Sequence, residues 1–406
     1  MTADHKKTTD DLAVFGGAPL FKDHKHVGQI NLPDWEHFKK EFQGIFDRVF
    51  FTNHGPKVNE LEDRLADFLK VKHIVCMTNG TISLMMAARC LGLQGEVIVP
   101  AFTFIATVQT LVWAGLKPVF CDVDPATHNI SPQKAAQLIN SNTCAILGVH
   151  LWGRPCDTRQ LETLASENKL ALFFDAAHAF GCSHRGIMVG NHGDVEVFSM
   201  HATKVLNAAE GGFAATNDDL MADKLRTMRN FHANESYTPV PVRINGKMSE
   251  AQAVMGLLSL EDFPANRERN KALYYAYSSN LSGIEGISLP ASFDENEQNN
   301  YQYLVVDVEP ETFGLNRDEV VRILETENVL ARRYFMPGVH RTLPFSKQYA
   351  ECIDKLPATD FLCGRLMQLP VGQSVSIEDV ARLCEFLRFC EKNASKIHNR
   401  ISGVNS

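Results

Sequence analysis

Short apolar runs alternate with amphipathic stretches through the first half of the chain. The amphipathic stretches carry apolar residues every three to four positions, which is the spacing of a helix that buries one face. Such helices are expected near 58–69, 81–91, 105–113, 132–139 and 158–168. Continuous apolar runs between helices are typical of a mainly parallel sheet covered on both faces. The pattern therefore predicts an α/β domain whose seven strands lie near 73–77, 96–100, 117–123, 144–151, 170–175, 195–200 and 212–216.

The pattern changes after the seventh predicted strand. Residues 249–260 read as a long apolar-rich helix without a strand partner, and the sequence after Pro264 is charged and helical. A strand near 301–308 and helices near 317–326 and 377–389 follow, which indicates a second, smaller α+β unit. The expected parts of the chain are an N-terminal arm at 1–35, a large α/β domain at 36–262 that begins with a short helix near 35–46, and a small C-terminal α+β domain at 263–406.

The composition is that of an ordinary globular protein, with 406 residues, 45% hydrophobic and 22% charged. A net charge of −8 and the lack of a long basic run argue against nucleic acid or an anionic membrane as the main partner. None of the ten cysteines forms a C-x-x-C pair, so no metal site is predicted. The polar N-terminus and the absence of long apolar stretches lead us to expect a cytoplasmic protein.

Three motifs of other α/β proteins are absent. The sequence lacks the G-x-G-x-x-G fingerprint of dinucleotide-binding domains and the G-x-x-x-x-G-K-[ST] loop of nucleotide triphosphatases. It also lacks the G-x-S-x-G elbow of α/β-hydrolases. The sequence therefore argues against these three chemistries for the predicted sheet.

The turn at 78–81 connects a predicted strand to a predicted helix. Gly80 permits a tight turn, and the backbone N–H groups near Thr81 lie at the positive end of the helix dipole. This arrangement suits a phosphate group. An ordinary helix cap would look the same, so the turn alone does not establish a ligand.

A carboxylate and a lysine follow later strands. Asp175 ends an apolar strand at the edge where open α/β sheets bind ligands, and it would suit a pyridinium nitrogen as well as a helix cap. Lys204 follows the strand at 195–200. Most lysines are solvated surface charges, but a lysine so placed can lose its proton and attack a carbonyl group. The ordered set of phosphate turn, Asp175 and Lys204 is much more specific than any one of them.

Segments throughout the chain resemble the DegT/StrS family of sugar aminotransferases, which depend on pyridoxal 5′-phosphate (PLP). They run in family order at 78–81, 99–107, 149–153, 174–181, 198–204, 210–212 and 245–250. The resemblance implies the aspartate aminotransferase-like fold of type I. Residues 12–17 and 150–156 are similar to the branch that makes dTDP-4-amino-4,6-dideoxyglucose from the 4-keto-6-deoxy sugar nucleotide.

The resemblance implies roles for individual residues. Lys204 would hold PLP as a Schiff base and carry the proton during amino transfer, while Asp175 would pair with the pyridinium nitrogen. His178 would lie near the 3′-oxygen of the cofactor, and Phe104, otherwise a plain core aromatic, would stack on its ring. The implied phosphate-binding residues are Gly80, Thr81 and Ser199.

One implied contact involves a second subunit. Asn245 would reach the phosphate of the neighbouring subunit's cofactor, which implies a homodimer with shared active sites. Many relatives have Tyr-Arg after this asparagine, whereas this chain has Gly246 and Lys247, so any substrate contact of that pair is in doubt.

The segment at 331–340 carries candidate substrate-binding residues, because in the family it lies near the active site. An arginine fork suits a carboxylate or a diphosphate, although a surface pair in the small domain is equally compatible with the sequence. The candidates are Arg332, Arg333, Tyr334 and His340.

The resemblance implies amino transfer from L-glutamate to C4 of a dTDP-linked 4-keto-6-deoxyhexose, in deoxyamino-sugar biosynthesis such as that of an O-antigen. Transamination at C3, of a UDP- or GDP-linked ketosugar or of a ketocyclitol stays open. Dehydrating relatives have histidine in place of the lysine, so Lys204 counts against that reaction. A non-enzymatic regulator is disfavoured by the intact Lys204, Asp175 and phosphate turn.

Overall fold

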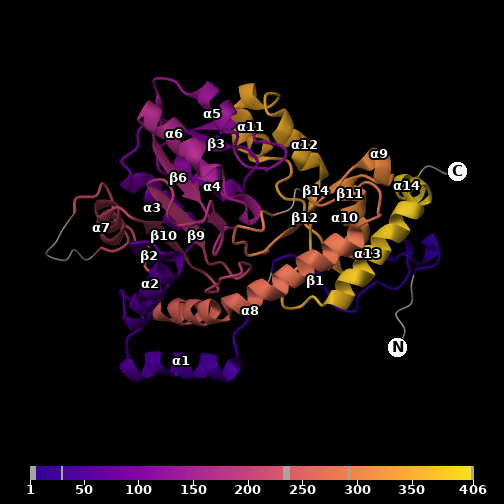
Figure 1. Cartoon of the computed structure of the whole chain (residues 1–406), viewed down its shortest axis with the longest axis horizontal. Helices are drawn as coiled ribbons and strands as arrows, with labels where there is room; N and C mark the ends of the chain where they lie inside the picture. Colours follow the sequence, from indigo (N-terminus) through magenta and orange to yellow (C-terminus); the bar gives the residue numbers. More distant parts are fainter. Residues whose placement is uncertain (1–5, 29–30, 232–237, 291–292, 404–406) are drawn as a thin grey trace.

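The computed structural model describes residues 6–28, 31–231, 238–290 and 293–403. Figure 1 shows an α/β body, in purple and magenta, connected by the long helix α8 (Glu250–Leu281) to a smaller unit drawn in orange and yellow. The fold class predicted from the sequence is confirmed.

The α/β body is built on a mainly parallel sheet. In the described part of the chain the sheet has seven strands in the order β2-β10-β9-β6-β5-β3-β4. Only β10 runs antiparallel to its neighbours. Each strand falls on a predicted apolar run, with ends that shift by at most two residues. The strands are β2 (His73–Met77), β3 (Glu96–Pro100), β4 (Lys117–Cys121), β5 (Thr143–Val149), β6 (Ala171–Asp175), β9 (Val195–Ser199) and β10 (Gly212–Thr216).

Helices cover both faces of this sheet. Successive strand residues point to opposite faces, so Val97 and Val99 pack under one set of helices and Ile98 under the other. All three are fully buried, which explains why the strands read as continuous apolar runs. The helices on the first face are α3 (Gly80–Cys90), α4 (Ile105–Trp113) and α7 (Asp219–Met228). Those on the second face are α2 (Pro56–Leu69), α5 (Pro132–Leu138), α6 (Thr158–Asn168) and the first half of α8.

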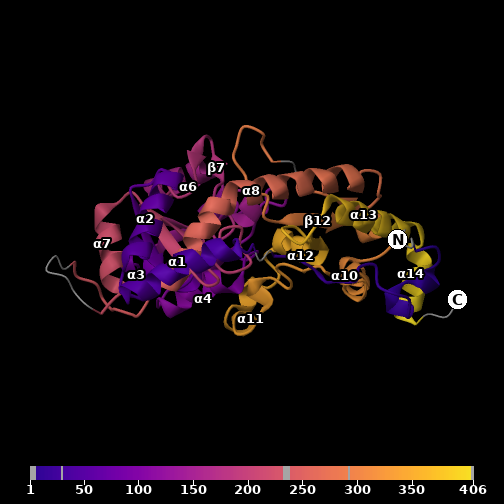
Figure 2. The same ribbon diagram turned by 90° about the horizontal axis from the view of Figure 1, so that it is seen from below.

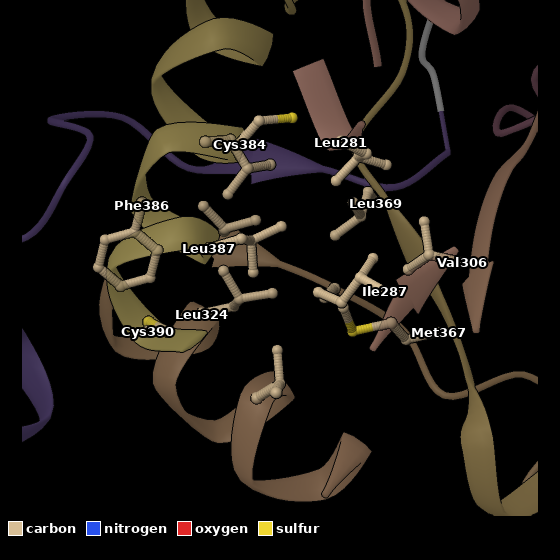
Figure 3. Packing of buried hydrophobic residues seen from close by; sticks show 14 of the residues in the cluster. Leu281, Ile287, Val306, Leu324, Met367, Leu369, Cys384, Phe386, Leu387 and Cys390 are labelled. Atoms are coloured by element: carbon tan, nitrogen blue, oxygen red, sulfur yellow. The ribbon is translucent and has the colours of Figure 1, made fainter. Parts of the chain in front are cut away.

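The smaller unit packs helices on a three-stranded antiparallel sheet. Its strands are β11 (Ile287–Ser288), β12 (Leu304–Val308) and β14 (Leu366–Leu369). Figure 3 shows side chains of α10 (Arg317–Thr326) and α13 (Ile377–Lys392), such as Leu324 and Leu387, packed against Val306 and Met367 of this sheet. These contacts form a core separate from that of the α/β body.

The N-terminal arm belongs to the core of the smaller unit. Leu12, Leu20 and Phe21 are buried in the cluster that also contains the residues of Figure 3. The short strand β1 (Lys25–His26) pairs with β13 (Val329–Leu330). Arg400 of α14 (Ala394–Ser402) lies with its Cζ 3.8 Å from the Phe15 ring centroid, so the arm also contacts the last helix of the described chain. The proposed limits at 35 and 262 stay a prediction, and residues 1–5 and 29–30 of the arm lie outside the described residues.

Helix α8 is longer than the sequence pattern indicated. The predicted helix at 249–260 continues through Pro264 to Leu281. It begins with a capping box in which Ser249 and Gln252 satisfy each other's backbone N–H groups. Its first half buries Leu257 against the α/β body and its second half buries Tyr277 in the smaller unit. Burial along both halves offsets the hydrogen bond that proline removes.

The remaining helices and short strands pack around the two units and α8. Figure 1 shows α1 (Trp35–Arg48) beneath α8, and Figure 2 shows α13 running beside the second half of α8. No helix in the described ranges is long and apolar enough to cross a membrane. The short elements are β7 (Ser183–His184), β8 (Ile187–Met188), α9 (Pro310–Phe313), α11 (Phe345–Gln348), α12 (Pro357–Arg365) and α14 (Ala394–Ser402).

Candidate active site

A cavity of about 490 Å³ lies where the smaller unit meets the carboxyl edge of the sheet. The ends of β6 and β9 form its floor, and the first turns of α3 and α4 form one wall. The opposite wall comes from the smaller unit and includes Tyr303, Arg332 and Phe335. The Trp152 and Phe335 rings stack across the junction, with centroids 5.1 Å apart. Residues far apart in the chain therefore meet in one pocket.

Asp175, at the end of β6, opens onto the cavity and is otherwise enclosed by protein. Thr107 Oγ1 donates to its Oδ2 at 2.8 Å, and the Ala177 N–H donates to its Oδ1 at 3.1 Å. Burial raises the pKa of the Asp175 carboxyl above its ordinary value, although both hydrogen bonds and the Lys204 charge act to lower it. Among the described residues no cationic side chain hydrogen-bonds to this carboxylate. A protonated ring nitrogen would supply such a partner.

The turn before α3 forms a cradle for an anion. Asn79 caps the helix by accepting the Ile82 N–H at 2.8 Å, and Gly80 and Thr81 line the cavity at the positive end of the helix. A side chain at Gly80 would place its Cβ 3.0 Å from the Ser199 Cβ. Glycine therefore lets the end of β9 approach the turn closely, and Ser199 also lines the cavity. This group fits a phosphate.

Lys204 follows β9 and is half-buried. Its backbone N–H donates to the His201 carbonyl at 2.8 Å, which fixes the turn that directs the side chain into the cavity. Its Nζ donates to the Tyr303 hydroxyl at 3.0 Å. The amine is thus inside the cavity and not a solvated surface charge.

His178 and Phe104 lie on two sides of the cavity. The His178 ring stacks on Trp152 with 5.5 Å between the centroids and is buried. Burial, and secondarily the charge of Lys204, holds the pKa of His178 well below its ordinary value, so the imidazole is neutral. Phe104 precedes α4, lines the cavity and is 52% exposed, which leaves its ring available for stacking.

Two expected substrate residues do not reach the cavity. Arg333 is exposed and lies 3.4 Å from the Asp318 carboxylate. His340 is fully buried and contacts Asp360 at 3.1 Å. Neither residue lines the cavity in this structure, and the expectation that they bind substrate stays a prediction. Arg332 and Tyr334 do line the cavity, and Arg332 Nη1 donates to the Tyr334 hydroxyl at 2.9 Å.

Asn245 is exposed and lies outside the cavity of its own chain. Its Oδ1 accepts from Lys247 Nζ at 2.6 Å. The Gly246 carbonyl accepts the Thr78 N–H at 2.9 Å, so the segment that contains Asn245 is hydrogen-bonded to the phosphate turn at 78–81. Its contact with a second subunit stays a prediction.

Sequence reasoning missed several residues of the cavity. Thr107 and Leu151 lie inside segments that carry the family resemblance, so they could have been singled out there. Tyr303 and Gly28 had no such signal, because they reach the site only through the packing of the smaller unit and the arm. Together with the residues above, they complete a site that fits PLP: a carboxylate for the ring nitrogen, a phosphate cradle and an unattached amine.

Comparison with known proteins agrees with this geometry. The profile of the DegT/DnrJ/EryC1/StrS aminotransferase family matches residues 34–388. A dTDP-4-amino-4,6-dideoxy-D-glucose transaminase of Shigella dysenteriae is 40% identical over 313 residues, 77% of this chain and 85% of that protein. One of Escherichia coli is 31% identical over 364 residues, 89% and 97% of the two chains. The crystal structure of DesI in the presence of its TDP-sugar product superposes with a TM-score of 0.93 at 40% identity and covers 97% of this chain and 100% of DesI.

Proposed function

Because the chain belongs to the DegT/DnrJ/EryC1/StrS aminotransferase family, we propose that it moves an amino group from L-glutamate to C4 of a dTDP-linked 4-keto-6-deoxyhexose, giving dTDP-4-amino-4,6-dideoxy-D-glucose. The chain is a sugar aminotransferase, and its cofactor is PLP. The two transaminases named above and the TDP-sugar product of DesI support the choice of substrate. The observation that carries the proposal is the single cavity shared by Lys204, Asp175 and the phosphate turn.

Bound PLP supplies a protonated ring that takes up the electrons released when a proton leaves the carbon bearing the amino group. The Asp175 carboxylate would hold the charge of the ring nitrogen, and Thr107 fixes the carboxylate in place. Gly80, Thr81 and Ser199 would hold the phosphate. Residues that would hold the cofactor thus share one cavity with Lys204, which would be within reach of the reacting carbon.

Lys204 Nζ would accept the proton from the donor carbon and deliver it to the neighbouring position, and the reverse sequence would serve the sugar. Amino donor and sugar therefore use the site in turn, and ping-pong kinetics are expected. The neutral His178 and the Phe335 ring line the cavity, and Trp152 stacks on both of them from behind. This wall would keep water from the reacting atoms.

Substrate binding is assigned to the rim of the cavity. Arg332, with its guanidinium directed to Tyr334, suits the diphosphate of a sugar nucleotide. The position of Asn245 outside its own cavity supports a homodimer in which each subunit completes the other's site. A cytoplasmic location stays a prediction.

A panel of ketosugar nucleotides tests the proposed function. We expect purified protein with PLP and ¹⁵N-glutamate to convert dTDP-4-keto-6-deoxyglucose to a product that carries ¹⁵N, with the amine at C4 by NMR. Lys204→Ala serves as the inactive control. If GDP- or UDP-linked ketosugars react and the dTDP sugar does not, the substrate assignment is wrong. If no ketosugar reacts, the proposed activity is wrong.

A further inference from the structure

We propose that Tyr303 is a further catalytic residue, whose hydroxyl orients the Lys204 amine and stabilises it each time it holds a proton. This inference rests on the proposed function, because it concerns the same amino-transfer step. Tyr303 lies immediately before β12 in the smaller unit, whereas Lys204 follows β9 in the α/β body. The contact therefore connects the reacting lysine to the other half of the molecule.

The geometry places the phenol oxygen against the reacting atom. Lys204 Nζ lies 3.0 Å from the Tyr303 hydroxyl and 5.6 Å from the centroid of the ring, so the contact is made at the oxygen. Tyr303 is 6% exposed and lines the cavity. Within the described part of the chain, this hydroxyl is the one hydrogen-bond partner of Lys204 Nζ.

The Tyr303 ring is held by its neighbours. Its centroid is 4.5 Å from that of His178 and 5.6 Å from that of Trp152, both of which belong to the α/β body. A phenol packed on two sides has little freedom to turn. The hydroxyl is therefore fixed in place before substrate binds, which is the condition for a catalytic hydrogen bond to be effective.

The backbone around Tyr303 is attached to the α/β body as well. Asn300 Nδ2 donates to the His178 and Phe180 carbonyls, each at 2.9 Å. Gln302 Oε1 accepts the Val205 N–H, next to Lys204, at 2.8 Å. The segment 300–303 thus spans from the His178 turn to the Lys204 turn and fixes the distance between them.

The chemistry follows from the direction of the hydrogen bond. When Lys204 Nζ takes the proton from the carbon of the amino donor, it becomes an ammonium group, and the bond to the Tyr303 oxygen becomes charge-assisted and stronger. When Nζ passes that proton on, the amine returns to its neutral form and the phenol keeps its own proton throughout. Tyr303 thereby holds the ammonium group during the proton transfer and directs the lone pair of the returning amine toward the substrate.

Tyr303→Phe separates this role from packing, because the ring and its stacking contacts remain. Tyr301→Phe is the matched control: it removes a hydroxyl two residues away, from a ring that packs against Phe293 and Tyr274 and does not line the cavity. We expect Tyr301→Phe to stay within twofold of wild type in every measurement below.

The first measurement needs no sugar. Full-length protein loaded with pyridoxamine phosphate, which leaves the Lys204 amine unattached, is treated with acetic anhydride, and acetylation of each lysine is followed by peptide mass. Loss of the hydrogen bond removes the contact that holds the Lys204 amine, so its nitrogen is more available to the reagent. We expect Tyr303→Phe to raise the labelling rate of Lys204 about three- to tenfold relative to the other lysines.

The second measurement follows a single turnover of the PLP-loaded protein with glutamate or with glutamate deuterated at its α-carbon. In Tyr303→Phe we expect the rate to fall about 10- to 100-fold, the half-saturating glutamate concentration to change less than threefold, and the deuterium isotope effect to rise. A merely structural defect would not raise the isotope effect. Incorporation of 3-fluorotyrosine at position 303 keeps the shape but weakens the acceptor oxygen, so a smaller change in the same direction is expected.

The proposal is overturned if Lys204 labelling and the isotope effect in Tyr303→Phe both match wild type, whether or not the rate falls. If wild-type protein fails to react with glutamate or any ketosugar, the proposed function is wrong, while the labelling result still reports on the Lys204–Tyr303 contact. The two failures are therefore distinguishable.

Discussion

Asp175 shows at the level of one residue how the cavity is prepared for a cation. Its carboxylate is held by the Thr107 hydroxyl and the Ala177 N–H, and burial raises its pKa. In protein stripped of cofactor this group opposes folding, because its charged form is less favourable in the folded state than in the unfolded chain. A positive partner would offset this cost of the buried charge.

Asp175→Asn should therefore separate stability from activity. With a folded pKa above the unfolded value near 3.8, wild type loses stability as the pH rises through the folded pKa, whereas the amide does not. Urea unfolding of cofactor-stripped protein at pH 7 should give an unfolding free energy for the variant equal to or above that of wild type. Its kcat should fall at least about 100-fold, because the ring nitrogen loses its counter-charge. A variant that is less stable and fully active would contradict this account.

The sequence predicted the place of a residue in the site where that residue follows a buried strand directly. Asp175 ends β6 and Lys204 lies in the turn after β9, and parallel strands bring their carboxyl ends to one edge. Arg333 and His340 do not line the cavity, because which side chains of an irregular segment face a cavity depends on tertiary packing. Tyr303 escaped notice for the same reason.

At the level of elements, α8 shows where pattern reading fails. The strands of the sheet were located within two residues because both of their faces are buried. Pro264 was taken as a boundary, yet the helix continues through it with its ring exposed to solvent. The helix is held by its burial against two separate cores, which no local window of sequence reveals.

Pro264→Ala should stabilise the protein. Alanine restores a backbone donor in mid-helix and is about 3 kcal/mol more favourable there in model helices, although the more flexible unfolded chain offsets part of this gain. We expect the free energy of unfolding in urea to rise by about 1–2 kcal/mol. Pro357→Ala is the control, because Pro357 is the first residue of α12, where proline fits. An unchanged or lower stability of Pro264→Ala would contradict the expectation that the proline costs α8 stability.

At the level of the whole molecule, one active site needs three distant parts of the chain. The sheet supplies Asp175 and Lys204, the smaller unit supplies Tyr303 and Arg332, and the N-terminal arm contributes Gly28. Asn245, by contrast, lies outside its own cavity. A homodimer would bring this residue to the site of the partner.

Mixing two inactive variants tests the shared site. Lys204→Ala and Asn245→Ala should each lose most activity as homodimers. After subunit exchange, each heterodimer should contain one intact site. The mixture should therefore regain about a quarter to a half of wild-type activity. Analytical ultracentrifugation should show that the protein sediments as a dimer. Lys204→Ala mixed with Asp175→Asn should not recover, because both residues belong to the same site. Recovery in the second mixture, or none in the first, would contradict the assignment of Asn245.

The central claim is that Lys204 is the residue to which PLP is attached and through which the amino group is transferred. Borohydride reduction of the PLP-loaded protein followed by peptide mass mapping tests this claim most directly. We predict one pyridoxyl group per chain, on the peptide that contains Lys204, and none on that peptide in Lys204→Arg. A pyridoxyl group on any other lysine of the wild-type chain would contradict the account.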